Sequence, residues 1–521
     1  MCDWAIRRAN DTVFEPSCGE AAFLSAAASR LLNLSSSVPS GRLQGIDIDG
    51  PSVTAAREVL SKLGVAAELA TGNFFDLAPT HRFDAVVGNP PYVRYQGFGG
   101  LDRDKALDAA RMQGVQLTRL ASSWAAFVIH AASFLSDTGR LALVLPAELM
   151  SVNYAAPVRR YLMQRFAHVR LVLFEERVFP GVSEEVVLLM AEGHGPTIHC
   201  DLQQTKNIAT LQTLVGQRYE PARSDDKWMV GLLPADAASA YSRVSSSNAF
   251  VPLQHWGETT LGMVTGNNSF FVLTEERARA HGLSRRDLIQ VCPPGSRHLR
   301  GLSFGEKAWD DLVVEGAAGY LFAPKFETPS KSAAKYIALG ETNLVHQGYK
   351  CRNRSPWWQV PRVAVPDAFL TYMNHDTPRI VANRAGLPHL NSVHGVAFRT
   401  ELREIGTDLL PIAALNTVTL LGAELVGRAY GGGLLKLEPK EADRLPVPSP
   451  ISLSGCESDL RALRPQLAKS LRKGALLDVV KQVDRVLRKQ WNLSGPQVEE
   501  LRNARDWLFG RREQRGRAKS E

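Results

Sequence analysis

The first 200 residues alternate short apolar runs with longer stretches in which apolar residues recur every three to four positions. The short runs predict strands at residues 12–16, 43–49, 83–90, 140–146, 169–175 and 184–192. Helical spacing marks residues 21–34, 51–64 and 122–135. Because alternating strands and helices are joined by crossover connections, this order predicts an α/β fold with a mainly parallel, doubly wound sheet.

The second half of the chain has a different character. Residues 225–450 are rich in glycine, aromatic residues and arginine, and a proline-rich stretch ends this region. Residues 455–509 return to helical apolar spacing, whereas residues 510–521 are basic and polar, which predicts an exposed, frayed tail. We therefore divide the chain into a first domain (1–200), a second domain (225–450) and a helical appendage with a basic tail (451–521).

The composition is that of a folded protein, because 45% of the 521 residues are hydrophobic and 22% are charged. These fractions exclude wholesale disorder, collagen and a coiled coil. The 61 Lys and Arg residues outnumber the 53 Asp and Glu residues, so the formal net charge is +8. This excess favours an anionic partner, although many enzymes of this size carry a similar excess on a solvated surface.

Six cysteines are spread along the chain without a CxxC pair or a histidine cluster at zinc spacing. The sequence therefore predicts neither a disulfide framework nor a structural metal. No apolar run approaches the roughly 18 residues that span a bilayer, and the N-terminus lacks the zones of a signal peptide. We expect a protein of the prokaryotic cytoplasm with no membrane partner.

Polar or glycine-containing segments follow the first three strands, where doubly wound sheets bind their ligands. The segment 15–19 (EPSCG) leads into a helix, and its glycine lets the backbone approach a ligand. Asp47 ends the second strand, where a carboxylate can accept both hydroxyls of a ribose, whereas Asp49 fits a helix N-cap better. Asn73 and Phe74 follow a third strand and can meet the edge and face of an adenine. Taken singly, each segment is also consistent with an ordinary turn or cap.

The sharpest chemical signal is Asn89-Pro90-Pro91-Tyr92, directly after the apolar run FDAVVG. An exocyclic amine attacks poorly, because its lone pair is conjugated with the ring, until two acceptors hold its hydrogens. The Asn89 side-chain carbonyl and the Pro90 main-chain carbonyl can supply these acceptors, and the stiff Pro-Pro pair holds them in place. Tyr92 can stack on the ring that bears the amine. As a bare tetrapeptide, the motif is also consistent with a tight loop.

Together these segments resemble the S-adenosylmethionine-dependent N6-adenine DNA methyltransferases of restriction-modification systems, of the Taq type with the cofactor motifs first. The resemblance covers roughly residues 1–450 and rests on EPSCGEAAFL, GIDID, GNFF, FDAVVGNPPY, GRLALVLPAE and RVFPGVSEEVVLL, then YGGGLLKLEPKEADRLPVP. It implies a seven-stranded, Rossmann-like class I methyltransferase domain followed by a mixed α+β target-recognition domain. It also implies S-adenosyl-L-methionine as cofactor and double-stranded DNA as partner.

The resemblance implies a role for each position of these motifs. The cofactor would be bound by Glu15, Pro16, Gly19, Asp47, Ile48, Asn73, Phe74 and Asn89. The target adenine would be bound at the catalytic residues Asn89, Pro90, Pro91 and Tyr92. Phe179 would pack on the other face of this base once it is flipped out of the duplex, and the alternative for Phe179 is a core side chain.

Three departures from the family pattern bear on cofactor binding. The Thr-Pro segment that usually covers the cofactor is missing before Met1, which indicates a truncated start or an incomplete pocket wall. Ala21 stands where the family has a second glycine, and alanine is tolerable there only with a negative φ. Asn73 replaces an aspartate. These departures predict weaker cofactor binding.

The sequence thus predicts a site-specific DNA adenine-N6 methyltransferase of a restriction-modification or related defence system. Cytosine N4 is the same kind of amine, but related cytosine-specific loops usually read Ser-Pro-Pro-Tyr, so Asn89 favours adenine. Two alternatives stay open: a catalytically impaired DNA-binding homologue, and an amine methyltransferase that acts on RNA or on protein glutamine. The long second half argues against the latter. A cognate restriction endonuclease would be a separate chain.

The second half carries candidate DNA contacts without revealing a recognition sequence. Its Arg and Lys side chains can neutralise phosphates, and its Asn, Gln, Arg and Ser side chains can read base edges. Trp357 and Trp358, between Arg354 and Arg362, are equally consistent with a surface platform and with core positions. Residues 265–268 (TGNN) fit either a turn that approaches DNA or a plain hairpin turn.

Overall fold

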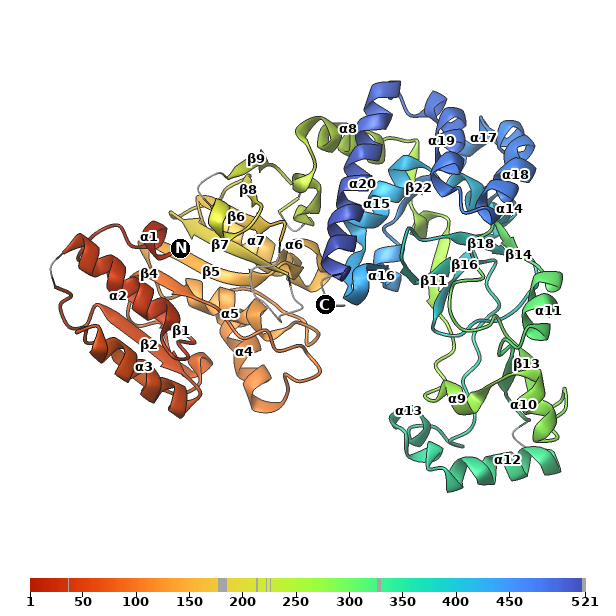
Figure 1. The fold of residues 1–521 in the computed structure, drawn as a ribbon, viewed down its shortest axis with the longest axis horizontal. Helices are drawn as coiled ribbons and strands as arrows, with labels where there is room; N and C mark the ends of the chain where they lie inside the picture. The colour runs from red at the N-terminus through yellow and green to blue at the C-terminus, as the bar shows by residue number, and fades with distance from the viewer. Residues whose placement is uncertain are drawn as a thin grey trace. The chain divides into compact units, whose positions relative to one another are not determined.

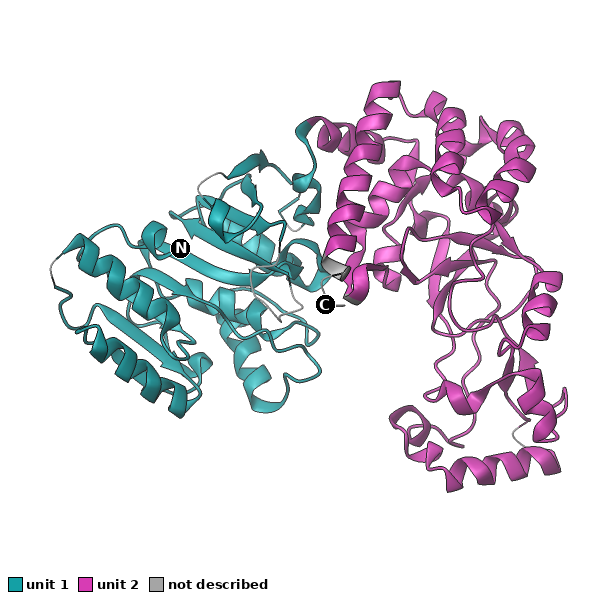
Figure 2. Cartoon of the chain, in the orientation of Figure 1, with its two compact units in different colours: residues 1–235 teal, residues 236–521 magenta. Residues whose placement is uncertain are grey.

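The computed structural model of the chain describes residues 1–35, 37–176, 185–211, 214–221, 223–224, 226–325 and 329–517. The chain forms two compact units, Met1–Ala235 (unit 1) and Asp236–Glu521 (unit 2), which are coloured separately in Figure 2. Unit 1 thus continues past residue 200, and the residues beyond 451 belong to unit 2.

In the described part of unit 1, nine strands form one sheet in the order β3-β2-β1-β4-β5-β7-β6-β8-β9 (Figure 1). The neighbours from β3 to β5 pair in parallel, whereas β7 runs antiparallel between β5 and β6. The strands predicted from the sequence are confirmed. They are β1 (Val13–Pro16), β2 (Leu43–Asp47), β3 (Glu68–Thr71), β4 (Phe83–Gly88), β5 (Leu135–Pro146), β6 (His168–Phe174) and β7 (Val186–Glu192).

Helices cover both faces of this sheet. Val13 packs in a core cluster with α1, α2 and α3, whereas the next residue, Phe14, stacks on Phe83 in an aromatic cluster that includes Phe127 of α5. Because successive strand residues point to opposite faces, these helices lie on opposite sides, and the doubly wound fold is confirmed. The helices are α1 (Cys2–Ala5), α2 (Ala22–Leu34), α3 (Gly50–Lys62), α4 (Gly100–Met112), α5 (Ser123–Ala132), α6 (Glu148–Ser151) and α7 (Ala156–Arg165).

Two further strands extend the sheet beyond the seven that the family resemblance implied, so that strand number is wrong for this chain. β8 (Cys200–Thr205) pairs in parallel with β6, and β9 (Val215–Tyr219) pairs antiparallel with β8. Both added strands lie at one edge of the sheet, beyond β6. The added pair covers the backbone edge that β6 would otherwise expose.

Unit 2 combines several small sheets with helices. Its largest sheet has the order β11-β19-β16-β18-β14, and smaller sheets pair β10-β22, β12-β15-β13 and β17-β21-β20. Mixed α and β content is thus observed, as predicted for the second domain. The strands are β10 (Phe250–Pro252), β11 (Gly257–Leu261), β12 (Val272–Leu273), β13 (Leu288–Gln290), β14 (Ser303–Phe304), β15 (Tyr320–Phe322), β16 (Ala368–Thr371), β17 (Met373–Asn374), β18 (Ile380–Asn383), β19 (Val393–Phe398), β20 (Arg428–Tyr430), β21 (Leu434–Lys436) and β22 (Pro446–Pro448).

The helices of unit 2 fall into two groups, with α9, α10, α12 and α13 near one end and α14, α15 and α17 to α20 near the other (Figure 1). The helical spacing over residues 455–509 is confirmed by α18, α19 and α20. The helices are α8 (Ala235–Ser245), α9 (Asn268–Phe271), α10 (Glu275–Ala280), α11 (Glu306–Val314), α12 (Lys331–Thr342), α13 (Tyr349–Arg352), α14 (Arg403–Ala413), α15 (Thr417–Val426), α16 (Pro439–Ala442), α17 (Pro450–Ser454), α18 (Glu457–Arg472), α19 (Leu476–Leu487) and α20 (Gly495–Arg517).

The start of the predicted tail is not frayed. α20 continues to Arg517, and Arg512 is only 4% exposed. Its guanidinium forms a two-point ion pair with Glu424 of α15, with Nε to Oε2 at 3.0 Å and Nη2 to Oε1 at 2.8 Å. The tail prediction is therefore wrong for this stretch, because a partner 88 residues away turns a basic residue into a buried one.

Among the described residues, no single helix is both long and apolar enough to cross a membrane. The segments Thr400–Ala413 and Thr417–Val426 reach that length and hydropathy only as a pair, and the chain bends by 90° between them. Both segments supply buried side chains to unit 2, among them Leu409 and Leu421.

Candidate active site

The loop that joins β1 to α2 has an unusual backbone. Ser17, Gly19 and Ala21 have φ angles of 156°, 47° and 66°. A Cβ built on Gly19 would meet no atom within 4 Å, so the backbone there faces open space. Because α2 begins directly after this loop, its first N–H groups add a preference for an anionic group such as a carboxylate.

From the sequence, alanine at position 21 is expected to be tolerable only with a negative φ. The φ of Ala21 is 66°, so this condition is not met. The left-handed conformation costs a non-glycine residue roughly 1–2 kcal/mol. The Ala21 methyl group is fully buried in the core cluster of α2 and α3, and burying a group of this size contributes about 0.8 kcal/mol. The two effects are of similar size, which explains how the fold accommodates alanine here.

Asp47 closes this loop from the end of β2. Its Oδ2 accepts a hydrogen bond from the Gly19 N–H at 2.8 Å, and its Oδ1 accepts one from the Asp49 N–H at 3.0 Å. Asp49 caps α3 by accepting from the Ser52 N–H at 2.9 Å, so its predicted capping role is confirmed. Between the two acids, Ile48 is 68% exposed. An apolar side chain is thus exposed beside a carboxylate at the carboxyl end of β2.

Glu15 is the buried acid of this region and is 2% exposed. Its Oε2 accepts a hydrogen bond from the Leu24 N–H in the first turn of α2, at 3.0 Å. Burial raises the pKa of Glu15 well above its ordinary value, the Leu24 bond opposes this rise, and the charge of Asp47 adds to it. A Cβ built on Gly88 would lie 3.5 Å from Glu15 Cγ, so the end of β4 adjoins this carboxyl group.

Asn73 and Phe74 follow β3, the strand that pairs with β2. The Asn73 Oδ1 accepts from the Phe75 N–H at 3.0 Å, and its Nδ2 donates to Asp102 Oδ1 at 2.9 Å. Phe74 is 6% exposed and packs with Phe14 and Phe127 in the aromatic cluster under α5. The structure thus places Phe74 in the core, where it supports the turn of Asn73.

The Asn89-Pro90-Pro91-Tyr92 motif leaves the end of β4 with Asn89 exposed and Tyr92 half-buried. The Tyr92 Oη lies 2.6 Å from Asn89 Oδ1 and 2.9 Å from the Val144 carbonyl oxygen, and can donate its proton to either. Over the described part of the chain, Pro90 has no hydrogen bond on its carbonyl oxygen. The Pro90 carbonyl oxygen is thus without a hydrogen bond from the described residues, whereas Asn89 Oδ1 is paired with the Tyr92 hydroxyl. That hydroxyl can donate to the Val144 carbonyl instead.

Ser123, at the start of α5, forms hydrogen bonds with Pro91 of the motif and with Val93 directly after it. Sequence reasoning missed this residue. Its Oγ donates to the Pro91 carbonyl and accepts from the Val93 N–H at 3.0 Å, while its own N–H donates to the Val93 carbonyl at 3.0 Å. Ser123 and Pro91 are 32 residues apart in the sequence. Only the fold brings them together, because Ser123 is the first residue of α5 and its hydroxyl bonds the motif and not the helix end.

Three other sequence predictions have different outcomes. Phe179 lies outside the described residues. Trp358 is 8% exposed, whereas Trp357 is partly exposed and donates from Nε1 to Glu341 Oε1 at 3.1 Å. Residues 265–268 form no hairpin, because Asn267 caps α9 by accepting from the Phe270 N–H at 3.1 Å. These tryptophans and this turn support the packing of unit 2.

The polar and apolar groups at the carboxyl ends of β1 and β2 fit a nucleoside that is linked to an amino acid. The open Gly19 loop suits a carboxylate, Asp47 has an acceptor for ribose hydroxyls, and exposed Ile48 can cover a flat base. Buried Glu15 adds a carboxyl group beside this loop. Among the described residues, no three His, Cys, Asp or Glu side chains are grouped to hold a metal ion. The residues therefore fit S-adenosylmethionine.

The order of the sheet and the residues at the carboxyl ends of β1, β2 and β4 define a class I methyltransferase. Comparison with known proteins identifies its family. A family model for the C-terminal domain of the Type II methyltransferase M.Eco57I matches residues 225–488, and a model for the Eco57I restriction-modification methylase matches residues 46–179. The chain belongs to this family of restriction-modification DNA methyltransferases. Its reaction is methyl transfer to DNA, and its cofactor is S-adenosyl-L-methionine.

Two relatives and one solved structure are similar over long stretches. The Type II methyltransferase M.XamI of Xanthomonas campestris pv. amaranthicola is 24% identical over 84% of this chain and 80% of its own length. The Type II methyltransferase M.AccI of Acinetobacter calcoaceticus is 22% identical over 70% of this chain and 68% of its own. The structure of the Type IIL restriction-modification enzyme MmeI in complex with DNA covers 97% of this chain and 73% of that one, at 11% identity and a TM-score of 0.56. The structural likeness concerns the fold.

Proposed function

We propose that this DNA methyltransferase modifies the N6 amine of adenine at a specific site in duplex DNA. The observation that carries the proposal is the Asn89 side-chain carbonyl, exposed at the end of β4 and beside the unpaired Pro90 carbonyl. Two acceptors on adjacent residues match an amine with two hydrogens. The Asn89 amide distinguishes this loop from the Ser-Pro-Pro-Tyr loops typical of cytosine N4 enzymes.

The chain's part in the reaction is to position and polarise the amine. The cofactor, when bound, supplies a methyl group on a sulfonium, which leaves as a neutral thioether. Asn89 Oδ1 and the Pro90 carbonyl accept the two amine hydrogens, which turns the nitrogen lone pair out of conjugation with the ring. Ser123 holds Pro91 and Val93, so the two acceptors are fixed before the substrate arrives. No strong base is needed, because the methylated nitrogen is acidic enough to lose its proton to water.

Tyr92 would stack on the flipped adenine. For Asn89 to receive the amine, the Tyr92 hydroxyl must give up its contact with Asn89 Oδ1, and the Val144 carbonyl is available to receive that proton at 2.9 Å. The ring and the hydroxyl of Tyr92 therefore have separable roles. The ring stacks on the base, and the hydroxyl frees Asn89 Oδ1 by turning to Val144.

Substituting Tyr92 tests these roles. Tyr92→Phe keeps the ring and should retain transfer within about threefold, whereas Tyr92→Ala should lose about 10- to 100-fold, because aromatic stacking on a base contributes about 1–3 kcal/mol. The loss in Tyr92→Ala should shrink on a substrate with a mispaired target adenine, since flipping such a base costs a few kcal/mol less. Single-turnover rates on matched and mispaired duplexes measure both; equal losses on the two substrates would contradict the stacking role.

Glu15 would face the positive charge of the cofactor, and Glu15→Gln tests this. A carboxyl whose pKa is raised by folding contributes stability below its unfolded pKa and loses it as the pH rises through its folded pKa. Glutamine keeps an acceptor for Leu24 without a charge to desolvate. The variant should therefore have a higher Tm than the parent near pH 8 and a smaller advantage near pH 5, yet should bind S-adenosylmethionine about tenfold more weakly. Calorimetry gives both readouts, and unchanged cofactor affinity would refute the assignment.

We assign residues 1–200 as the catalytic domain and residues 225–450 as the target-recognition domain, followed by the helical appendage (451–521). The basic and polar side chains of that region and its match to the family's C-terminal domain model support this division. A restriction endonuclease of the same specificity would be a separate chain.

Nucleoside mass spectrometry tests the proposed function. Unmethylated plasmid DNA is incubated with the purified protein and S-adenosylmethionine, then digested to nucleosides. N6-methyladenine as the only new base is the expected result, and N4-methylcytosine would move the assignment to the other amine. If no methylated base forms, calorimetric titration with S-adenosylmethionine identifies the impaired homologue, for which the left-handed Ala21 is the supporting observation.

A further inference from the structure

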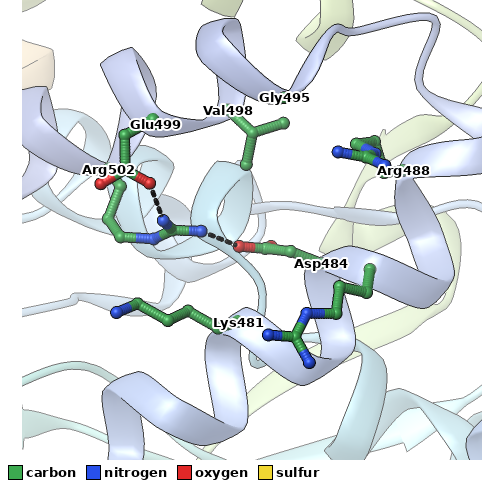
Figure 3. A pocket seen from close by; sticks show the side chains of 8 residues that line it. Lys481, Asp484, Arg488, Gly495, Val498, Glu499 and Arg502 are labelled. Atoms are coloured by element: carbon green, nitrogen blue, oxygen red, sulfur yellow. Dashed lines mark hydrogen bonds and ion pairs between the residues drawn. The ribbon is translucent and has the colours of Figure 1, made fainter.

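A groove in the C-terminal helices of unit 2 has more basic than acidic residues in its lining. It has a volume of about 330 Å³ and lies between α19 and the start of α20. Figure 3 shows side chains from both helices converging on it. We call it the basic groove; its charged lining residues are Lys481, Asp484, Arg485, Arg488, Glu499 and Arg502.

The two carboxylates of the groove are already used by one arginine. Arg502 Nη2 lies 2.9 Å from Asp484 Oδ2, and its Nη1 pairs with Glu499 (Figure 3). Asp484 is further held by the Thr417 N–H at 2.9 Å. Neither carboxylate is therefore free to neutralise the other cations that line the groove.

Lys481, Arg485 and Arg488 are exposed and, over the described residues, form no ion pair. Lys481 and Arg485 are four residues apart and share one face of α19, and Arg488 directly follows the last residue of this helix, so the three span about 10 Å along its axis. One DNA strand presents about three phosphates over this length. A Cβ built on Gly495 would lie 3.1 Å from Arg488 Nη1, which places that guanidinium against the first residue of α20.

We propose that the basic groove binds the phosphate backbone of duplex DNA and supplies affinity without reading sequence. The proposal rests on the proposed function, because a DNA methyltransferase must hold the duplex while it searches for its site. Three unpaired cations facing one side match a polyanion rather than a single metabolite, and the groove offers no aromatic surface for a base. Its contacts are therefore to phosphates alone.

The test replaces Lys481, Arg485 and Arg488 together with glutamine. A matched control makes the same change of three charges at Lys469, Arg472 and Lys473, exposed residues on and after neighbouring α18. Binding to duplexes with and without the methylation site is measured as a function of salt. The groove variant should bind both duplexes about tenfold more weakly at physiological salt. The slope of log Kd against log salt should fall by about 2 to 3, since each lost phosphate contact lowers this slope by nearly 1.

The control variant should change the salt slope by less than 1, and the methylation pattern of the groove variant at saturating DNA should be that of the parent. An equal loss in both variants would show a general charge effect and overturn the proposal, as would weakened binding of single-stranded RNA with unchanged duplex binding. If the parent methylates DNA but the groove variant binds normally, only the groove proposal fails. If the slope changes as expected but no methylated base ever forms, only the proposed function fails.

Discussion

Asn89→Ala should abolish methyl transfer while the protein still binds its cofactor. The substitution removes one of the two acceptors that hold the target amine, and losing a preorganised polar contact of this kind typically costs about 100- to 1000-fold in rate. The loop itself should keep its shape, because Tyr92 retains the Val144 carbonyl at 2.9 Å and Ser123 retains Val93 at 3.0 Å. The affinity for S-adenosylmethionine should change by less than about threefold, since the Glu15, Gly19 and Asp47 contacts involve no Asn89 atom. The cofactor role that the family resemblance also gives Asn89 is therefore expected to be minor.

Single-turnover methylation and calorimetric cofactor titration check this pair of results. Asn10→Ala is a suitable control, because Asn10 is also an exposed asparagine of unit 1 and accepts a hydrogen bond from Arg42 through its main-chain carbonyl oxygen. Equal loss of transfer and cofactor binding in Asn89→Ala would mean that Asn89 supports the cofactor and not the target amine.

Glu424→Ala should destabilise unit 2 by about 3–5 kcal/mol, because it leaves the Arg512 guanidinium buried without its counterion. Both side chains of this pair are 4% exposed, and Arg512 also donates to the carbonyls of His375 and Gly433. The arginine cannot simply turn into solvent, so the cost falls on the folded state. Urea denaturation gives the free energy of unfolding, and hydrogen exchange reports where α15 and α20 open.

A double variant separates the charge from the packing. Glu424→Leu with Arg512→Met removes both charges and keeps most of the volume, so it should be much more stable than Glu424→Ala alone. Glu404→Ala, an exposed glutamate on α14, should change stability by less than about 0.5 kcal/mol. If Glu424→Ala is as mild as this control, α20 is not held by its ion pair with α15.

Much of unit 1 could be predicted from sequence because its signals are local. Most strands of the parallel sheet are short apolar runs, and α2, α3 and α5 have clear helical spacing, so the order of these elements follows without knowledge of contacts. The helices α4 and α7 were not predicted. The positions of Glu15, Gly19, Asp47 and Asn89 follow as well, because the ends of parallel strands meet at one edge. The added strands β8 and β9 were missed, since their pattern is too weakly apolar to mark a sheet strand.

The site residues divide in the same way. The motif from Asn89 to Tyr92 was predicted to present acceptors, yet no pattern indicated that the Tyr92 hydroxyl contacts Asn89. Phe74 was interpreted as a ligand contact, and the structure places it among core aromatics, because an aromatic residue carries no local mark of whether its face is free. The roles assigned to these residues stay predictions until the variants above are measured.

The sequence by itself predicted strands β1 to β7 and helices α2, α3 and α5 of unit 1, and with them the edge and the motif to which we assign the chemistry. Only the tertiary structure decided the sign of φ at Ala21, the hold of Ser123 on Pro91 and the burial of Arg512 against Glu424. The physical reason is range: apolar periodicity and turn chemistry act within about ten residues. A hydrogen bond across 32 residues or an ion pair across 88 depends on where the whole chain has folded.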